Sequence, residues 1–166
     1  MFTLTHGLVV DARYGEEMAV AADIIFGDDN EGVSWSKVMF GLMEGTDARA
    51  TIDTTLALCA RLFANIETND NETTRGELGE SLAEIVIETV WGWRNTELTE
   101  HAKSLMVVIA DDGEGDAVTI GELTRQGGKH LLVIMTALTL GISAMSSLAT
   151  GDATPGDPLR KVLSGI

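Results

Sequence analysis

The stretch LLVIMTALTLGISAMSSLA, residues 131–149, decides the fold, because none of its 19 positions carries a charge. As a helix it would be about 28 Å long, close to the thickness of a bilayer's hydrocarbon region. It is therefore either a membrane span or the central helix of a bundle. Six of its residues are Thr, Ser or Gly, and neither Trp nor Tyr flanks it. These features favour a buried central helix, with a membrane-associated protein as the alternative.

Apolar residues recur at helical spacing on both sides of this stretch. On residues 47–66, Ile52, Leu56, Cys59 and Phe63 share one face, and Thr54 lies opposite. The predicted helices are 14–26, 34–42, 47–66, 75–94, 96–109, 119–126, 129–149 and, in the C-terminal tail of 150–166, a short one at 158–164. Each of the longer helices has an apolar face that needs a partner, which the segment 131–149 can supply.

The sequence thus predicts an all-α fold: a compact bundle of six to seven helices around a buried central helix at about 129–149. A chain of 166 residues has the size of one domain, so we expect a single helical domain over 1–166. Residues 2–10 alternate between two faces, as in a strand. No second run alternates as well, so residues 1–12 are predicted to form an extended N-terminal arm or edge strand.

The charge of the chain is strongly negative and unevenly distributed. Lys and Arg total 11 and Asp and Glu total 26, for a net charge of −15. Residues 1–122 hold 24 of the acids, whereas residues 123–166 have a small excess of bases. Such a surface repels nucleic acid and anionic lipid, so we expect no direct nucleic-acid binding. It suits a basic protein partner, although solubility alone or adaptation to high salt would give the same composition.

Helix 75–94 carries the most specific surface pattern. At 100° per residue from Leu78, a continuous acidic ridge falls between about 200° and 280°. It consists of Glu77, Glu80, Glu84 and Glu88. Trp91 lies at about 220°, within the ridge. The opposite, predicted core face comprises Leu78, Leu82, Ile85, Val86, Thr89 and Trp93. Trp91 is therefore expected to pack on a neighbouring segment, to join a homo-oligomer contact, or to anchor a basic partner.

Motifs for metal, cofactor or catalytic chemistry are missing from the sequence. Cys59 is the single cysteine, and its place in an apolar stripe indicates packing rather than reactivity. Three scattered histidines do not make a zinc site, and the acidic loops 28–31 and 111–116 do not fit the calcium-loop pattern. No nucleophile elbow, phosphate loop or dinucleotide motif occurs. We therefore expect no cofactor and no enzyme activity, with an unrecognised enzyme or metal-binding bundle as an alternative.

The function predicted from these observations is that of a non-catalytic, acidic protein-interaction module. It would bind a basic protein surface through Glu77, Glu80, Glu84, Glu88 and Trp91, or it would self-associate. A sharper version is an inhibitor whose carboxylates imitate the phosphates of a nucleic acid. The N-terminus, Met1–Gly7, has no basic region and no long apolar core, so no signal peptide is predicted and a cytoplasmic location is expected.

Overall fold

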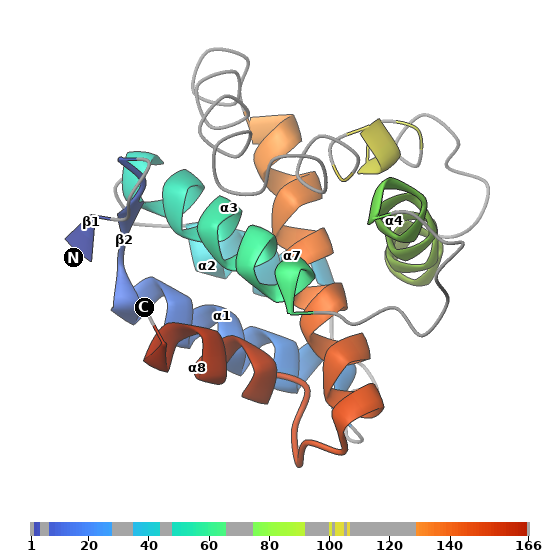
Figure 1. Ribbon diagram of the computed structural model, residues 1–166. Helices are drawn as coiled ribbons and strands as arrows, with labels where there is room; N and C mark the ends of the chain where they lie inside the picture. Colours follow the sequence, from blue (N-terminus) through green and yellow to red (C-terminus); the bar gives the residue numbers. More distant parts are fainter. Residues whose placement is uncertain are drawn as a thin grey trace.

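The protein is an all-α helical bundle built around one central helix, as its computed structural model shows (Figure 1). The structure describes residues 2–3, 7–27, 35–43, 48–65, 75–91, 100, 102–104, 106 and 129–165. Its elements are β1 (Phe2–Thr3), β2 (Val9–Val10), α1 (Ala12–Phe26), α2 (Trp35–Met43), α3 (Ala48–Ala64), α4 (Arg75–Trp91), α7 (Lys129–Thr150) and α8 (Asp157–Ser164). The predicted helix 119–126 and most of 96–109 lie outside the described residues.

Helix α7 occupies the centre, as its uncharged sequence predicts. It contacts α1, α3, α4 and α8, and every residue from 134 to 144 is buried. In Figure 1, α1, α3 and α8 lie on one side of α7 and α4 lies on the other. The window Val133–Thr150 is long and apolar enough to cross a membrane, but 67% of it is buried inside the fold. The apolar surface of α7 is thus covered mainly by the other helices of the chain.

Helix α3 is buried almost as completely as α7, which its sequence did not indicate. Thr54, predicted to lie on a polar face, is fully buried. Its Oγ1 accepts a hydrogen bond of 2.8 Å from the backbone N–H of Asp11, and Asp53 Oδ2 accepts one of 3.1 Å from that of Val9. Because these polar groups have partners, they can be buried without a large desolvation cost.

The N-terminal segment, predicted as an extended arm or edge strand over 1–12, contains two short strands that pair with each other, and α1 begins within it at Ala12. Strand β1 pairs antiparallel with β2, in the register Phe2 to Val10 and Thr3 to Val9. Gly7 has a φ of 80°, the left-handed conformation that glycine adopts readily and that suits a reversal of the chain. Asp11 then begins α1 by accepting hydrogen bonds from the N–H groups of Arg13 and Tyr14.

Helix α8 joins the bundle through a charged network with α1. Arg160 donates hydrogen bonds to Asp23 at 2.7 Å, to Glu16 at 3.1 Å and to Asp157 at 3.2 Å. Asp23 also accepts a hydrogen bond of 2.7 Å from the N–H of Gly156. The bonds to Glu16 and Asp23 join residues more than 130 positions apart, so they fix the C-terminal helix on the N-terminal one.

Candidate functional site: an acidic helix face beside an apolar groove

Helix α4 packs on α7 through a seam of small and β-branched residues. Its buried positions are Gly79, Leu82, Ala83, Val86 and Ile87. The contact with α7 is close, because a Cβ placed on Gly141 would lie 2.5 Å from Cγ2 of Val86. Gly79 makes a second close approach, since a Cβ there would lie 3.1 Å from the carbonyl oxygen of Met106. Small residues on both helices therefore bring α4 near the centre of the bundle.

The buried face of α4 differs from the predicted one. Ile85 was expected in the core but is 48% exposed, and Thr89 is exposed as well. Ile87, which lies about 180° from Leu78, is instead fully buried. The helix is thus rotated by about 80° from the orientation that its large apolar residues indicate. Gly79, which lies close to Met106, and Ala83 are both on the buried face, while Ile85 lies at its edge.

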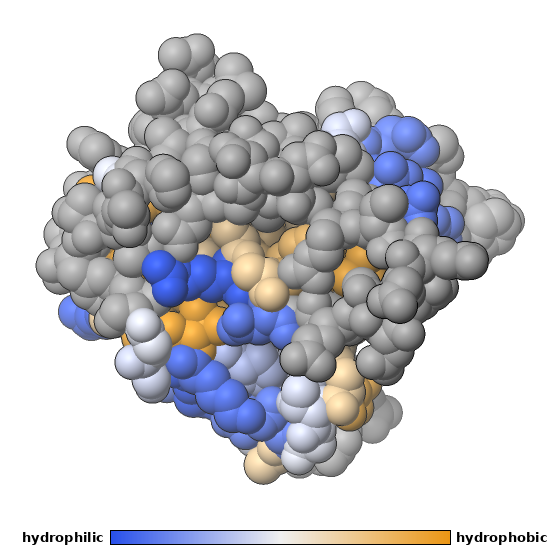
Figure 2. Space-filling view, in the orientation of Figure 1, coloured by the Kyte–Doolittle hydropathy of each residue, from blue (hydrophilic) through white to orange (hydrophobic). Residues whose placement is uncertain are grey.

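The four ridge glutamates, Glu77, Glu80, Glu84 and Glu88, are all exposed on α4. Hydrophilic surface is visible over this helix in Figure 2. Among the described residues, Lys103 Nζ lies 3.4 Å from Glu84 Oε2 and 4.0 Å from Glu100 Oε1. The sequence of α4 contains one basic residue, Arg75. The structure therefore places the predicted ridge together on one helix and adds a partial counter-charge at Glu84.

Trp91 is the last residue of α4, and its side chain lies outside the described residues. Its predicted role as an anchor therefore stays a prediction. The predicted core residue Trp93 also lies outside the described part of the chain, as do loops 28–31 and 111–116.

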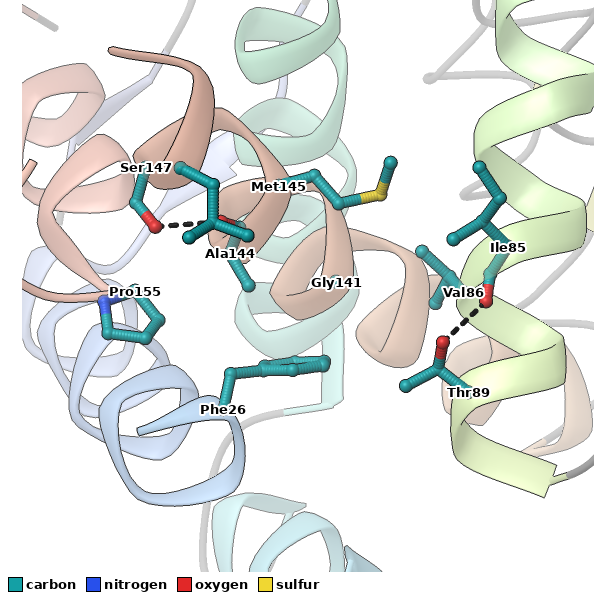
Figure 3. A pocket seen from close by; sticks show the side chains of 10 residues that line it. Phe26, Ile85, Val86, Thr89, Gly141, Ala144, Met145, Ser147 and Pro155 are labelled. Atoms are coloured by element: carbon teal, nitrogen blue, oxygen red, sulfur yellow. Dashed lines mark hydrogen bonds between the residues drawn. The ribbon is translucent and has the colours of Figure 1, made fainter. Parts of the chain in front are cut away.

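An apolar groove of about 210 Å³ lies beside the ridge, between α4, α7 and the end of α1 (Figure 3). Ile85 and Thr89 form its α4 wall, and Phe26 extends from α1 on the other side. The residues that line it are Phe26, Ile85, Val86, Thr89, Gly141, Ala144, Met145, Ser147, Leu148 and Pro155. Leu148 is 85% exposed, so a large aliphatic side chain stands in solvent at the edge of the groove.

The hydroxyls of the groove already have acceptors within their own helices. Thr89 donates to the carbonyl of Ile85 at 2.8 Å, and Ser147 donates to that of Ala144 at 2.7 Å (Figure 3). The groove thus offers a ligand mainly apolar contact, and its nearest charged neighbours in α4 are the ridge glutamates. Ile85 and Glu88 are about 60° apart around the helix, so the apolar wall borders the acidic face.

A larger cavity of about 640 Å³ lies across Met145 from this groove, between α3, α4, α7 and α8. Its charged members are Asp152 and Lys161, which form an ion pair with each other. The hydrogen bond from Lys161, assisted by one from Thr150, lowers the pKa of Asp152 below its ordinary 3.8. Because the two charges pair with each other, the residues that line this cavity leave no uncompensated charge to orient a ligand.

Two buried titratable groups, Cys59 and Tyr14, are poor candidates for chemistry. Burial raises the pKa of the Cys59 thiol to about 12, with the neighbouring Thr139 opposing the shift. Burial likewise raises the pKa of Tyr14 to about 12. Both groups are protonated at neutral pH, so neither is poised as a nucleophile or base. Cys59 is fully buried, which confirms its predicted packing role.

The described residues contain no group of three or more His, Cys, Asp and Glu side chains that could hold a metal ion. The three histidine side chains lie outside the described part of the chain. Known proteins add no further guidance, because no family model, curated protein or solved structure matches this chain.

Sequence reasoning found the ridge but missed the groove. The groove assembles Phe26, Ile85 and Leu148 from three elements, and Ile85 was expected to be buried. The spacing of Gly79 and Ala83, two small residues four positions apart, is the signal that could have identified the true contact face. A face of small residues allows the closest helix approach, which leaves the adjacent large residue at the edge.

Proposed function

We propose that this protein is a non-catalytic interaction module that binds a cationic segment of a partner protein through the acidic face of α4. The observation that carries the proposal is the joint exposure of Glu77, Glu80, Glu84 and Glu88 on one helix. A cationic partner would find complementary charge along the length of this face.

The energetics of α4 support the same proposal. Glu80, Glu84 and Glu88 succeed one another at four-residue spacing, and such like-charge pairs cost an isolated helix a few tenths of a kcal/mol each. The last turn contains no base, so Glu88 also faces the negative end of the helix dipole. A bound cationic segment would relieve both repulsions, and that relief adds to the affinity.

The proposal is tested with a fluorescent oligolysine peptide and the purified protein, by anisotropy at several salt concentrations. We expect binding that weakens steeply as salt rises, because screening reduces the attraction of exposed charges. Glu88→Lys should weaken binding several-fold through loss of an attraction and gain of a repulsion.

Glu17→Lys is the matched control, because it makes the same charge change at an exposed position of α1. Glu17 forms an ion pair of 3.7 Å with the highly exposed Arg13, so its loss should leave the fold intact. Equal weakening by the two variants would attribute binding to net charge and overturn the role of α4. Binding that is insensitive to salt would overturn the proposal altogether.

A further inference from the structure

We infer that the partner segment is an amphipathic cationic helix, whose apolar side enters the groove between α4, α7 and the end of α1. This inference rests on the proposed function and adds a second requirement, which is an apolar face on the bound segment. The observation that supports this inference is that an apolar groove lies beside an acidic helix face.

The groove has the size and the chemistry to hold an apolar side chain. A cavity of roughly 150 Å³ is enough to hold a benzene molecule. The groove, at about 210 Å³, has room for an apolar side chain of a partner. Its hydroxyls at Thr89 and Ser147 are bonded to their own helices, so an apolar side chain displaces no required hydrogen bond.

The groove is bordered by exposed apolar side chains. Ile85 is 48% exposed and Leu148 is 85% exposed, and both line the same groove. Covering them would remove apolar area from water, at about 25 cal/mol for each Å². Contiguous exposed apolar surface that is bordered by polar residues is typical of sites that bind another chain.

Carboxylates of α4 lie directly beside the apolar wall of the groove. On α4 the groove wall at Ile85 borders Glu88, with Glu84 next around the helix. A helix lying along the groove would therefore place its apolar stripe on Ile85 and Leu148 while its adjacent cationic face meets Glu84 and Glu88. An amphipathic helix in a hydrophobic groove is a recurrent mode of peptide recognition. The excess of acid on this side requires the polar face to be cationic.

The experiment compares two Lys/Leu peptides of identical composition. In one, leucines recur at helical spacing, and in the other the order is scrambled so that no apolar face forms. We expect the amphipathic peptide to bind about tenfold more tightly, which corresponds to about 1.4 kcal/mol. The double variant Ile85→Ser/Leu148→Ser should abolish this difference while oligolysine binding stays unchanged.

Val20→Ser/Ile24→Ser is the matched control, since both residues are 45% exposed on α1 and neither lines the groove. This variant should keep the tenfold preference. If it loses the preference while Ile85→Ser/Leu148→Ser keeps it, the apolar contact lies elsewhere and the inference is overturned.

The remaining outcomes separate this inference from the proposed function. Equal, salt-sensitive binding of both peptides would overturn the amphipathic partner and leave the acidic module standing. If oligolysine fails to bind, the proposed function fails. If the free protein is a dimer that Ile85→Ser/Leu148→Ser converts to a monomer, a second copy occupies the groove, and the inference is wrong.

Discussion

Helix α8 has Asp157 in its first turn and Lys161 in its last, whereas α4 has Glu77 in its first turn and no base in its last. The charges of α8 thus agree with its helix dipole. Arg160 pairs with Glu16 and Asp23 of α1, which fixes α8 on the bundle, and with Asp157 of its own helix. The charges of α4 point outward, and an apolar seam holds the helix in place. The acidic surplus of the chain therefore includes carboxylates that join two helices and others that are exposed on α4.

The largest effect should come from the seam of α4. Ile87→Ala removes a fully buried side chain and should lower the free energy of unfolding by about 2–4 kcal/mol, from lost transfer energy and a residual cavity. The matched variant Ile85→Ala should cost under about 1 kcal/mol, because that side chain is half exposed. Urea denaturation measures both, and a larger cost at Ile85 would mean that α4 docks through the face that its large residues predict.

The glycine beside α8 offers the next test. A Cβ on Gly156 would lie 2.2 Å from the backbone oxygen of Ala19, which cannot move aside without moving α1. Gly156→Ala should therefore cost about 1–3 kcal/mol in unfolding free energy.

Gly15→Ala is the control for this steric argument. Its Cβ would meet Leu163 Cδ2 at 2.7 Å, but that atom ends a flexible side chain. Alanine also favours the helix by up to about 1 kcal/mol over glycine. Thermal melts should show little change for Gly15→Ala, and equal losses in the two variants would contradict the distinction between backbone and side-chain neighbours.

Removing the cation of α8 should have a smaller effect. Arg160→Met deletes the hydrogen bonds to Glu16, Asp23 and Asp157 and should cost about 1–2 kcal/mol, since the network is partly open to solvent. Arg13→Met, which loses one highly exposed ion pair, should change unfolding by under about 0.5 kcal/mol. Chemical denaturation decides this, and equal effects would show that the network adds nothing to the docking of α8.

How far the sequence predicts this fold depends on the kind of signal each element carries. The uncharged run in α7 and the apolar spacing in α3 identify helices without reference to any partner. The rotation of α4 could not be predicted in the same way, because glycine and alanine contribute little to an apolar pattern. The burial of Asp53 and Thr54 depends on N–H groups of Val9 and Asp11, more than 40 residues away, that no local pattern reveals.

The two parts of the candidate site, the ridge and the groove, differ in the same way. The ridge needs only the spacing of Glu77, Glu80, Glu84 and Glu88 on one helix, so the sequence predicts it directly. The groove depends on how three elements meet, and it includes the point where Gly141 of α7 lies close to Val86 of α4. Tertiary contact decides what lies beside the ridge.

Acid should destabilise the start of α8. Hydrogen bonds from Thr154, reinforced by Arg160, lower the pKa of Asp157 below its ordinary 3.8. A folded-state pKa below the unfolded value contributes stability that is present above pH 3.8 and is lost as pH falls through the folded pKa. Unfolding free energy should therefore decline below pH 4 or so with a steeper slope in the native chain than in Asp157→Asn. Identical slopes would contradict the role of this carboxylate.

Lys103→Gln should cause the smallest loss of stability and should strengthen the binding of oligolysine. Lys103 lies near Glu84 and Glu100, so Lys103→Gln should cost a few tenths of a kcal/mol, as expected for a partly exposed ion pair. The same substitution leaves Glu84 uncompensated, so oligolysine should bind about twofold more tightly at low salt. A thermal melt tests the expected loss of stability, and an anisotropy titration tests the expected gain in oligolysine binding. Weaker binding would mean that Lys103 orders the acidic face for its partner, because loss of a competing cation can only strengthen a purely electrostatic contact.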